Sequence, residues 1–176
     1  MKNFKVVVAL VMSIVAMSCS SDDDNNNNNT SNNVMSIAGE EYDIAAAGLE
    51  NFGENADGSY DWDVFLLGDG ITINSSTPVG QGAVIYLDLN TNSADGLVAG
   101  TYSFAQDRAP FTWVYADACT SFNTSNFTCA TGSYNATAGT VVISGSGSST
   151  SVEVNLQDSE GASITASYTG GFSVID

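Results

Sequence analysis

The chain of 176 residues carries 20 acidic side chains against three basic ones, contains no histidine, and has a formal net charge of −17 at pH 7. Without histidine it cannot use imidazole as a general base, form a Ser-His or Cys-His nucleophile pair, or build a histidine-ligated metal site. So few positive charges cannot neutralise a phosphate backbone, and nucleic acid is therefore excluded as a partner.

The N-terminus has the composition of a signal peptide. Two lysines precede an apolar run over residues 6–17, and the small residue Ser18 stands just before Cys19. A bilayer-spanning helix needs about 20 residues, so this run is too short to span a membrane but suits the apolar part of a signal peptide. We therefore expect residues 1–18 to be a signal peptide.

An apolar run that ends in a small residue and a cysteine resembles the lipobox of bacterial lipoproteins. The resemblance implies that Cys19 is acylated and becomes the first residue of the mature chain, which its acyl chains anchor stably in a membrane. The Ser-Ser-Asp-Asp-Asp run after Cys19 resembles the surface-export signal of Bacteroidota lipoproteins. This second resemblance implies display on the outer face of the outer membrane. If the run is only a solvated spacer, the domain lies on the periplasmic face.

Residues 20–33 contain only Ser, Asp, Asn and Thr, so they offer no apolar surface whose burial would offset the entropy of ordering. We expect residues 19–33 to comprise the lipidated cysteine and a disordered tether, and residues 34–176 to form a single β domain. Removal of the leader leaves Arg108 as the only basic side chain, so the mature chain has no lysine for Schiff-base chemistry.

The domain lacks helical periodicity and consists of short runs rich in Val, Ile, Tyr, Phe and Thr between Gly, Asn, Asp and Ser clusters. Alternation within residues 60–67 places Trp62 and Val64 on one strand face and Asp61 and Asp63 on the other. The pattern predicts an all-β fold, either an antiparallel β-sandwich or a lipocalin-like β-barrel. In chain order we predict strands at residues 35–38, 41–49, 60–67, 70–74, 83–90, 101–104, 111–119, 127–134, 139–144, 151–157, 163–168 and 172–175.

The two remaining cysteines, Cys119 and Cys129, are expected to form a disulfide because exported proteins fold in an oxidising compartment. If residues 123–125 form a hairpin loop, Phe122 faces Asn126 and Cys119 faces Cys129 across the hairpin. This register brings the two sulfur atoms within disulfide distance.

Oxygen-bearing side chains recur at alternate positions in the segment DLNTNSADG, residues 88–96. Asp88, Asn90 and Asn92 match the start of a calcium-binding loop, and Asp95 adds a fourth oxygen ligand. The segment departs from that loop because Ser stands at the sixth position in place of Gly, and because the closing Glu is missing. A polar turn after a strand is the alternative interpretation. Calcium is the only cofactor that the sequence suggests.

Two further groups of side chains are candidates for binding. Asp61 and Asp63 share a strand face and would bind a cation or hydroxyl groups if that face lines a cleft. Aromatic side chains around Arg108 suggest a surface for a neutral ligand, although tryptophans inside strands are also candidates for the core. The predicted ligand surface consists of Trp62, Arg108, Trp113 and Tyr115. No pair of carboxylates is placed for acid–base catalysis, so we predict that the protein is not an enzyme.

Residues 139–176 alternate apolar and polar side chains between Gly-rich turns, and they resemble the closing hairpins of small Bacteroidota lipoproteins. The resemblance implies an exported all-β module and supplies no catalytic residues. Together with the anchor, it leads us to expect a non-catalytic binding module at the cell surface, for a glycan or a protein ligand. The alternatives are a structural surface lipoprotein without a ligand and a lipocalin-like carrier of a small apolar molecule.

Overall fold

A computed structural model describes residues 33–176, which form twelve β-strands and one short 3₁₀ helix. The predicted signal peptide, the lipidation of Cys19 and nearly all of the tether lie outside these residues. Within residues 33–176, no helix is long and apolar enough to cross a membrane. In chain order the elements are β1 Val34–Ile37, β2 Glu40–Glu54, β3 Tyr60–Gly68, β4 Ile71–Asn74, β5 Thr77–Thr91, β6 Gly100–Phe104, β7 Thr112–Asn123, β8 Thr128–Cys129, β9 Ser133–Ser144, η1 Gly147–Ser149, β10 Thr150–Asp158, β11 Ser163–Gly170 and β12 Ser173–Val174.

Nine of the strands close into a β-barrel. Their order around the barrel is β1, β2, β3, β5, β7, β6, β9, β10 and β11, and β11 pairs back onto β1. Strands that follow each other along the chain are mostly neighbours, so the barrel has an up-and-down arrangement in which β1 closes the ring. The prediction of an all-β fold is confirmed, and of the two arrangements left open the structure has the barrel.

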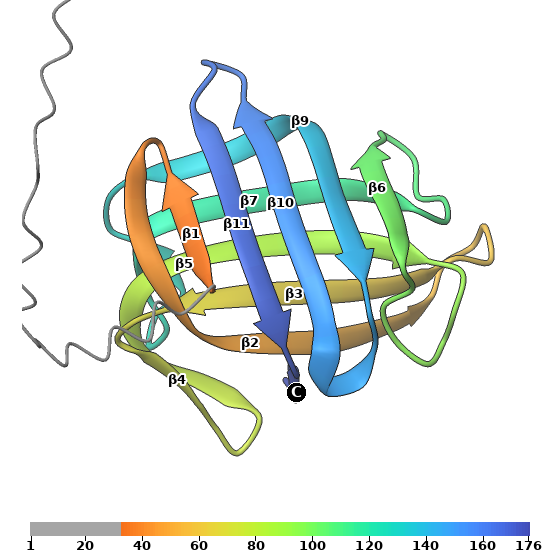
Figure 1. The fold of residues 1–176 in the computed structure, drawn as a ribbon, viewed down its shortest axis with the longest axis horizontal. Coiled ribbons are helices and arrows are strands. Elements are labelled where there is room, and N and C mark those ends of the chain that lie inside the picture. Colours follow the sequence, from red (N-terminus) through yellow and green to blue (C-terminus); the bar gives the residue numbers. More distant parts are fainter. Residues whose placement is uncertain (1–32) are drawn as a thin grey trace, which may run out of the picture.

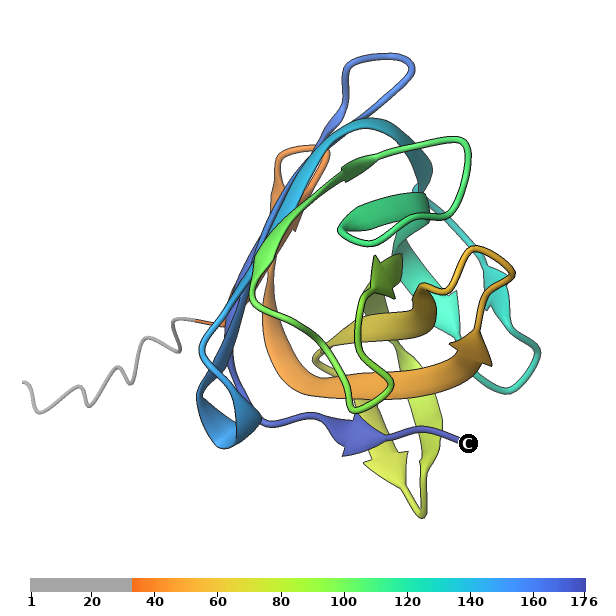
Figure 2. The same cartoon turned by 90° about the vertical axis from the view of Figure 1, so that its right-hand side faces the viewer.

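The barrel consists of two layers whose strands run across each other (Figure 1). One layer holds β1, β9, β10 and β11, and the other holds β2, β3, β5 and β7. Strand β2 is 15 residues long and bends from one layer into the other, as the side view shows (Figure 2). Its register against β3 shifts between Ile44 and Ala46, and such an irregularity helps a strand to turn the corner of a barrel.

The barrel interior is filled by apolar side chains at alternate strand positions. Val64 and Leu66 of β3, with Ile85, Leu87 and Leu89 of β5, belong to this core and are each 0% exposed. Because side chains alternate between the two faces of a strand, the residues between them point to the outer face of the barrel. The outer face of β3 and β5 is where the polar candidate residues lie.

Both tryptophans are buried, and Trp113 belongs to the barrel core. Trp113 is 0% exposed, and its indole N–H donates a hydrogen bond of 3.3 Å to the carbonyl of Gly139. Trp62 is 9% exposed, and its indole N–H donates to the carbonyl of Ser93 at 3.2 Å. This placement corrects the prediction that both rings contribute to a ligand surface. Inward strand positions bury both rings and give each N–H one partner, so neither ring is offered to an external ligand.

A second, smaller apolar cluster lies on the outer face of β3, β5 and β7. Its buried members are Leu67, Ile71, Val84 and Cys119. The β4–β5 hairpin, which projects from the barrel in Figure 1, contributes Ile71, and the disulfide-bonded end of β7 contributes Cys119. These two chain segments give this side of the barrel an additional apolar layer.

The predicted disulfide between Cys119 and Cys129 is confirmed, with the two Cα atoms 5.9 Å apart. The predicted register of its hairpin is wrong. Cys129 of β8 lies opposite Phe122 of β7, and Cys119 lies opposite Ser133 of β9. The turn occupies residues 124–127 in place of 123–125, so the disulfide joins β7 to β8 diagonally. The predicted strand over residues 127–134 is accordingly split into β8 and the start of β9.

Candidate functional site

The outer face of β3 and β5 carries polar side chains that alternate with core residues. Asp61 and Asp63 occupy outward positions on β3, and Asp88 and Asn90 occupy outward positions on β5. In the antiparallel register Asp63 lies opposite Asp88, and Asp61 lies opposite Asn90. Because opposite residues on one sheet face are close together, this register joins two separate stretches of sequence into one cluster.

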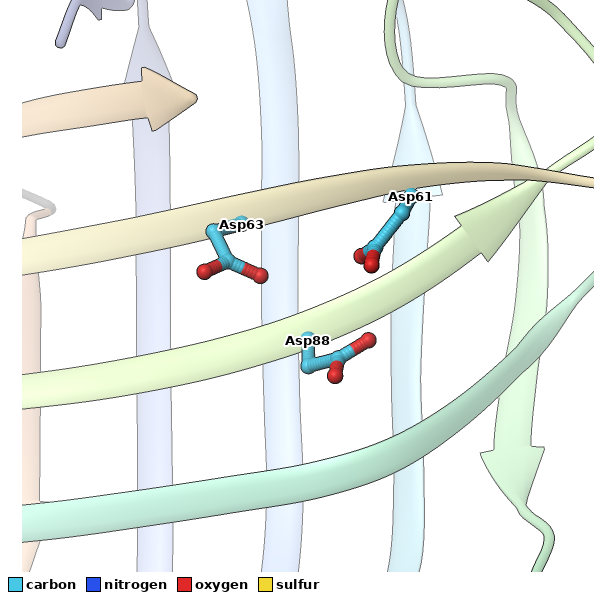
Figure 3. Close-up of side chains that lie close together, drawn as sticks. All are labelled: Asp61, Asp63 and Asp88. Carbon is cyan, nitrogen blue, oxygen red and sulfur yellow. The ribbon is translucent and has the colours of Figure 1, made fainter. Parts of the chain in front are cut away.

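Asp61, Asp63 and Asp88 form a group that we call the acidic triad (Figure 3). One carboxylate oxygen from each residue lies within 4.8 Å of the corresponding oxygens of the other two. Figure 3 shows the side chains of Asp61 and Asp63 directed from β3 toward Asp88 on β5. The three residues are 9%, 5% and 6% exposed, in that order, so three carboxylates share a largely dehydrated space.

Arg108 supplies positive charge beside the acidic triad. It lies in the loop between β6 and β7, which is held to the end of β5 by a 2.7 Å hydrogen bond from the Phe111 N–H to the carbonyl of Asn90. The guanidinium is 2.6 Å from Oδ2 of Asp61 and 2.9 Å from Oδ2 of Asp88. It also donates to Oδ1 of Asp88 at 3.0 Å and to Oδ1 of Asn90 at 3.1 Å. Arg108 is the only basic residue within 33–176, so an ionised triad keeps two negative charges without a counter-charge.

Two buried polar atoms near Arg108 have no hydrogen-bond partner in the described part of the chain, namely Oδ1 of Asp61 and Nδ2 of Asn90. Exchanging the amide oxygen and nitrogen of Asn90 would not help, because its Oδ1 already accepts from Nδ2 of Asn55 at 2.9 Å and from Arg108. A buried polar group without a partner costs about 1–3 kcal/mol. Such atoms indicate that water, an ion or a ligand completes the site.

Burial dominates the ionisation of the acidic triad. It raises the pKa of Asp63 to about 7, while a 2.6 Å hydrogen bond from the Tyr86 hydroxyl lowers that pKa and the charge of Asp88 raises it further. Burial likewise raises the pKa of Asp88, an effect that Asp61 strengthens and Arg108 opposes. The pKa of the Tyr86 phenol is raised by its burial and by donation to Asp63. The acidic triad therefore takes up protons near neutral pH.

We expect the chain in a chelating buffer to become less stable as the pH rises from about 5 to about 8. The pKa of Asp63 in the folded state is about 7, above the ordinary value of 3.8. The folded state therefore binds more protons than the unfolded state within this window, and its stability is lost as the pH rises through the folded pKa. Asp63→Asn, which is neutral at every pH, should reduce the decline by about 1–2 kcal/mol after allowance for solvent screening. Urea denaturation across this pH range measures the effect, and equal declines in the two proteins would contradict it.

A hollow on the same side of the barrel, which we call the outer pocket, adjoins the acidic triad. Its cavity volume is about 330 Å³, at the lower end of the range for ligand pockets. Tyr86 joins the two features, because its hydroxyl donates to Asp63 while its ring lines the pocket. The Tyr86 ring centroid lies 5.2 Å from that of Phe65 and 5.7 Å from that of Tyr115. The lining consists of Phe65, Leu67, Pro78, Val84, Tyr86, Tyr115, Asp117, Ala118, Cys119, Phe122, Phe127 and Cys129.

The structure separates the four residues that the sequence grouped as a calcium loop. Asp88 and Asn90 are buried on β5 beside Arg108, whereas Asn92 and Asp95 are exposed in the loop that follows β5. The structure therefore places the first two with the acidic triad and leaves the last two in the loop. The alternative interpretation, a polar turn after a strand, describes the second half of the segment.

Two residues of the predicted ligand surface lie on the outer side of the barrel. Tyr115 lines the outer pocket, and Arg108 lies beside the acidic triad. Sequence reasoning missed Phe65, Tyr86 and Phe127 as pocket residues. The alternation that turns Asp61 and Asp63 outward applies equally to Phe65, so that residue had a signal in the sequence. Phe127 had none, because its place depends on the turn between β7 and β8.

No protein family, curated protein or solved structure matches the chain. Function is therefore inferred from the chemistry of the acidic triad and the outer pocket. Both lie on one side of the barrel, and Tyr86 is in contact with both.

Proposed function

We propose that the chain is an outer-membrane lipoprotein, anchored through Cys19 and displayed at the cell surface, whose barrel is a non-catalytic binding module. The outer pocket is the ligand site. The observation that carries this proposal is a concave apolar surface with exposed aromatic rings, since Tyr115 is 45% and Phe127 72% exposed. A contiguous apolar surface of this kind marks an interaction site, because covering it removes apolar surface from water. The anchor and the surface location rest on the lipobox and the acidic run in the sequence.

The pocket lining specifies the chemistry of the ligand. Its one ionisable carboxyl group belongs to Asp117, and burial raises the pKa of that group. The phenols of Tyr86 and Tyr115 are the other polar side chains among the lining residues, and the rest of the lining is apolar. A ligand with an apolar body and a positive group fits this arrangement, because the positive group would stabilise ionised Asp117.

The overall charge of the protein favours the same class of ligand. A net charge of −17 attracts cations and repels anions over distances longer than a contact. We therefore propose that the ligand is a segment of a partner protein that presents an apolar side chain next to a basic one. A carrier function would need space inside the barrel, where Met35, Tyr102 and Trp113 are each 0% exposed. The outer pocket is the more suitable place for an apolar group.

Two matched peptides test this proposal on the mature chain with Cys19→Ser. One contains Phe next to Arg, and the other contains Phe next to Glu. Nuclear magnetic resonance titration should show saturable binding of the first peptide, and binding of the second should be weaker by about tenfold or more. Tyr115→Ala and Phe127→Ala should each weaken binding of the Arg peptide by about tenfold.

Phe52→Ala is the matched control, because Phe52 is 60% exposed but does not line the outer pocket. It should leave the affinity unchanged. Equal loss in Phe52→Ala and Tyr115→Ala would move the ligand site away from the pocket. Binding on a glycan array together with no binding of either peptide would replace the protein ligand by a glycan. The absence of both would leave a structural lipoprotein without a ligand.

A further inference from the structure

We infer that the acidic triad of Asp61, Asp63 and Asp88 binds one Ca²⁺ ion on the outer face of the barrel. This inference does not depend on the pocket ligand. The three carboxylates offer one oxygen each within 4.8 Å of one another. Ca²⁺ binds oxygen at about 2.3–2.6 Å, so ligands on opposite sides of the ion are about 5 Å apart. The spacing of the three carboxylates therefore suits a single ion.

An unsatisfied atom provides independent support for the site. Asp61 is 9% exposed, and its Oδ1 has no hydrogen-bond partner anywhere in residues 33–176. Its other oxygen is already paired with Arg108. Figure 3 shows the Asp61 carboxylate directed toward the other two members of the triad. A cation between the carboxylates would supply the partner that Oδ1 of Asp61 lacks.

The charge of the site matches a divalent cation. Arg108 balances one of the three carboxylates, and two negative charges remain when all three are ionised. Carboxylate oxygens are hard ligands, which favour Ca²⁺ and Mg²⁺ over zinc or copper. Mg²⁺ demands near-octahedral geometry at short distances, whereas Ca²⁺ tolerates irregular sets of oxygens. Three carboxylates held at fixed positions on two strands are such an irregular set, and the assignment is therefore to Ca²⁺.

Terbium luminescence tests the inference directly, because Tb³⁺ occupies Ca²⁺ sites and is excited by nearby tyrosine. The Tyr86 hydroxyl lies 2.6 Å from Oδ2 of Asp63, so this ring is the expected antenna. The mature chain with Cys19→Ser should give saturable emission with one Tb³⁺ per chain. Ca²⁺ should displace the Tb³⁺ at lower concentration than Mg²⁺ does. Saturating Ca²⁺ should also raise the melting temperature by about 4 °C or more relative to a chelating buffer.

Variants locate the bound ion. Asp61→Asn and Asp63→Asn keep the side-chain shape and should each weaken Ca²⁺ binding by about tenfold or more. Asp95→Asn is the matched control, because it removes the carboxylate of the calcium loop that the sequence suggested, and it should leave the affinity unchanged. Tyr86→Phe keeps all three carboxylates and removes the expected antenna, so it should lower the Tb³⁺ emission. Melting curves in the chelating buffer verify that each variant is folded.

Three results would overturn the inference. The first is an unchanged melting temperature together with no saturable Tb³⁺ emission. The second is loss of Ca²⁺ binding in Asp95→Asn with retention in Asp61→Asn, which would place the ion in the loop. The third is equal, weak binding in every variant, which would indicate a diffuse attraction to the acidic surface. A failure of the peptide titration with success of the Ca²⁺ titration would affect only the proposed pocket ligand.

Discussion

Replacing Arg108 with methionine should lower the free energy of unfolding by about 2–4 kcal/mol near pH 7.5 in a chelating buffer. The guanidinium contacts Asp61 at 2.6 Å and holds both oxygens of Asp88, whose side chain is only 9% exposed. Methionine preserves much of the apolar stem and removes the charge. Both carboxylates would then be buried without a counter-charge, which costs more than the pair itself contributes. Urea denaturation measures the change.

Two further variants separate the charge effect from lost packing. Asp88→Asn combined with Arg108→Met removes charges of both signs, so it should recover at least about half of the lost stability. Arg108→Lys should lose about 1–2 kcal/mol, because one ammonium cannot replace the fork that holds Asp88 and Asn90 together. A double variant that is no more stable than Arg108→Met alone would mean that packing, and not charge, accounts for the loss.

The loss of stability in Arg108→Met should also depend on pH. Burial raises the pKa of Asp63 and Asp88, so both carboxyls take up protons as the pH falls toward 5. Protonation removes the uncompensated charges, and the difference between the original protein and Arg108→Met should therefore shrink at low pH. A difference that is constant between pH 5 and pH 8 would contradict an electrostatic role for Arg108.

The acidic triad and the outer pocket are joined by one residue, Tyr86. Tyr86 donates its hydroxyl to Asp63, and its ring stands between those of Phe65 and Tyr115 in the pocket. Any change in the charge of Asp63 acts on the acceptor of this hydrogen bond.

Alternation was sufficient to predict which face of β3 carries the polar residues. It placed Asp61 and Asp63 on one face of this strand and Trp62 and Val64 on the other face, and the structure agrees. It could not bring Asp88 to the same cluster, because that depends on the register between β3 and β5. Register between strands is fixed by the whole barrel, and a local pattern does not contain it.

The calcium loop and the disulfide hairpin illustrate the same limit. Spacing suggested that Asp88 and Asp95 act together, yet β5 continues to Thr91 and keeps Asp88 on a buried strand face. The two cysteines were paired correctly from their short separation and from the expectation of an oxidising compartment. Their hairpin register was wrong because residues 124–127 form a longer turn than the one assumed. Proximity in sequence therefore predicted the covalent bond better than it predicted the hydrogen bonds.

Trp113→Ala should have the largest effect on stability, lowering the free energy of unfolding by about 3–5 kcal/mol. Trp113 is 0% exposed in the barrel core, donates to the carbonyl of Gly139 and contacts Phe104 in a tilted arrangement with ring centroids 4.8 Å apart. Alanine would leave a cavity and remove the hydrogen bond to the Gly139 carbonyl. The melting temperature should fall by about 10 °C or more. Thermal unfolding followed by circular dichroism measures this fall.

The same substitution distinguishes a core residue from a ligand platform. A platform residue is held partly open to solvent, so its removal weakens ligand binding and spares stability. Trp113→Ala should do the opposite, because the ring lies inside the barrel and the outer pocket lies on the outside. The peptide affinity of Trp113→Ala, measured below its lowered melting temperature, should stay within about threefold of the original. Tyr115→Ala should instead lower the affinity and leave the melting temperature within about 2 °C. If Trp113→Ala abolished binding without a loss of stability, the tryptophan would have to face a ligand, and the barrel interior would become the binding site.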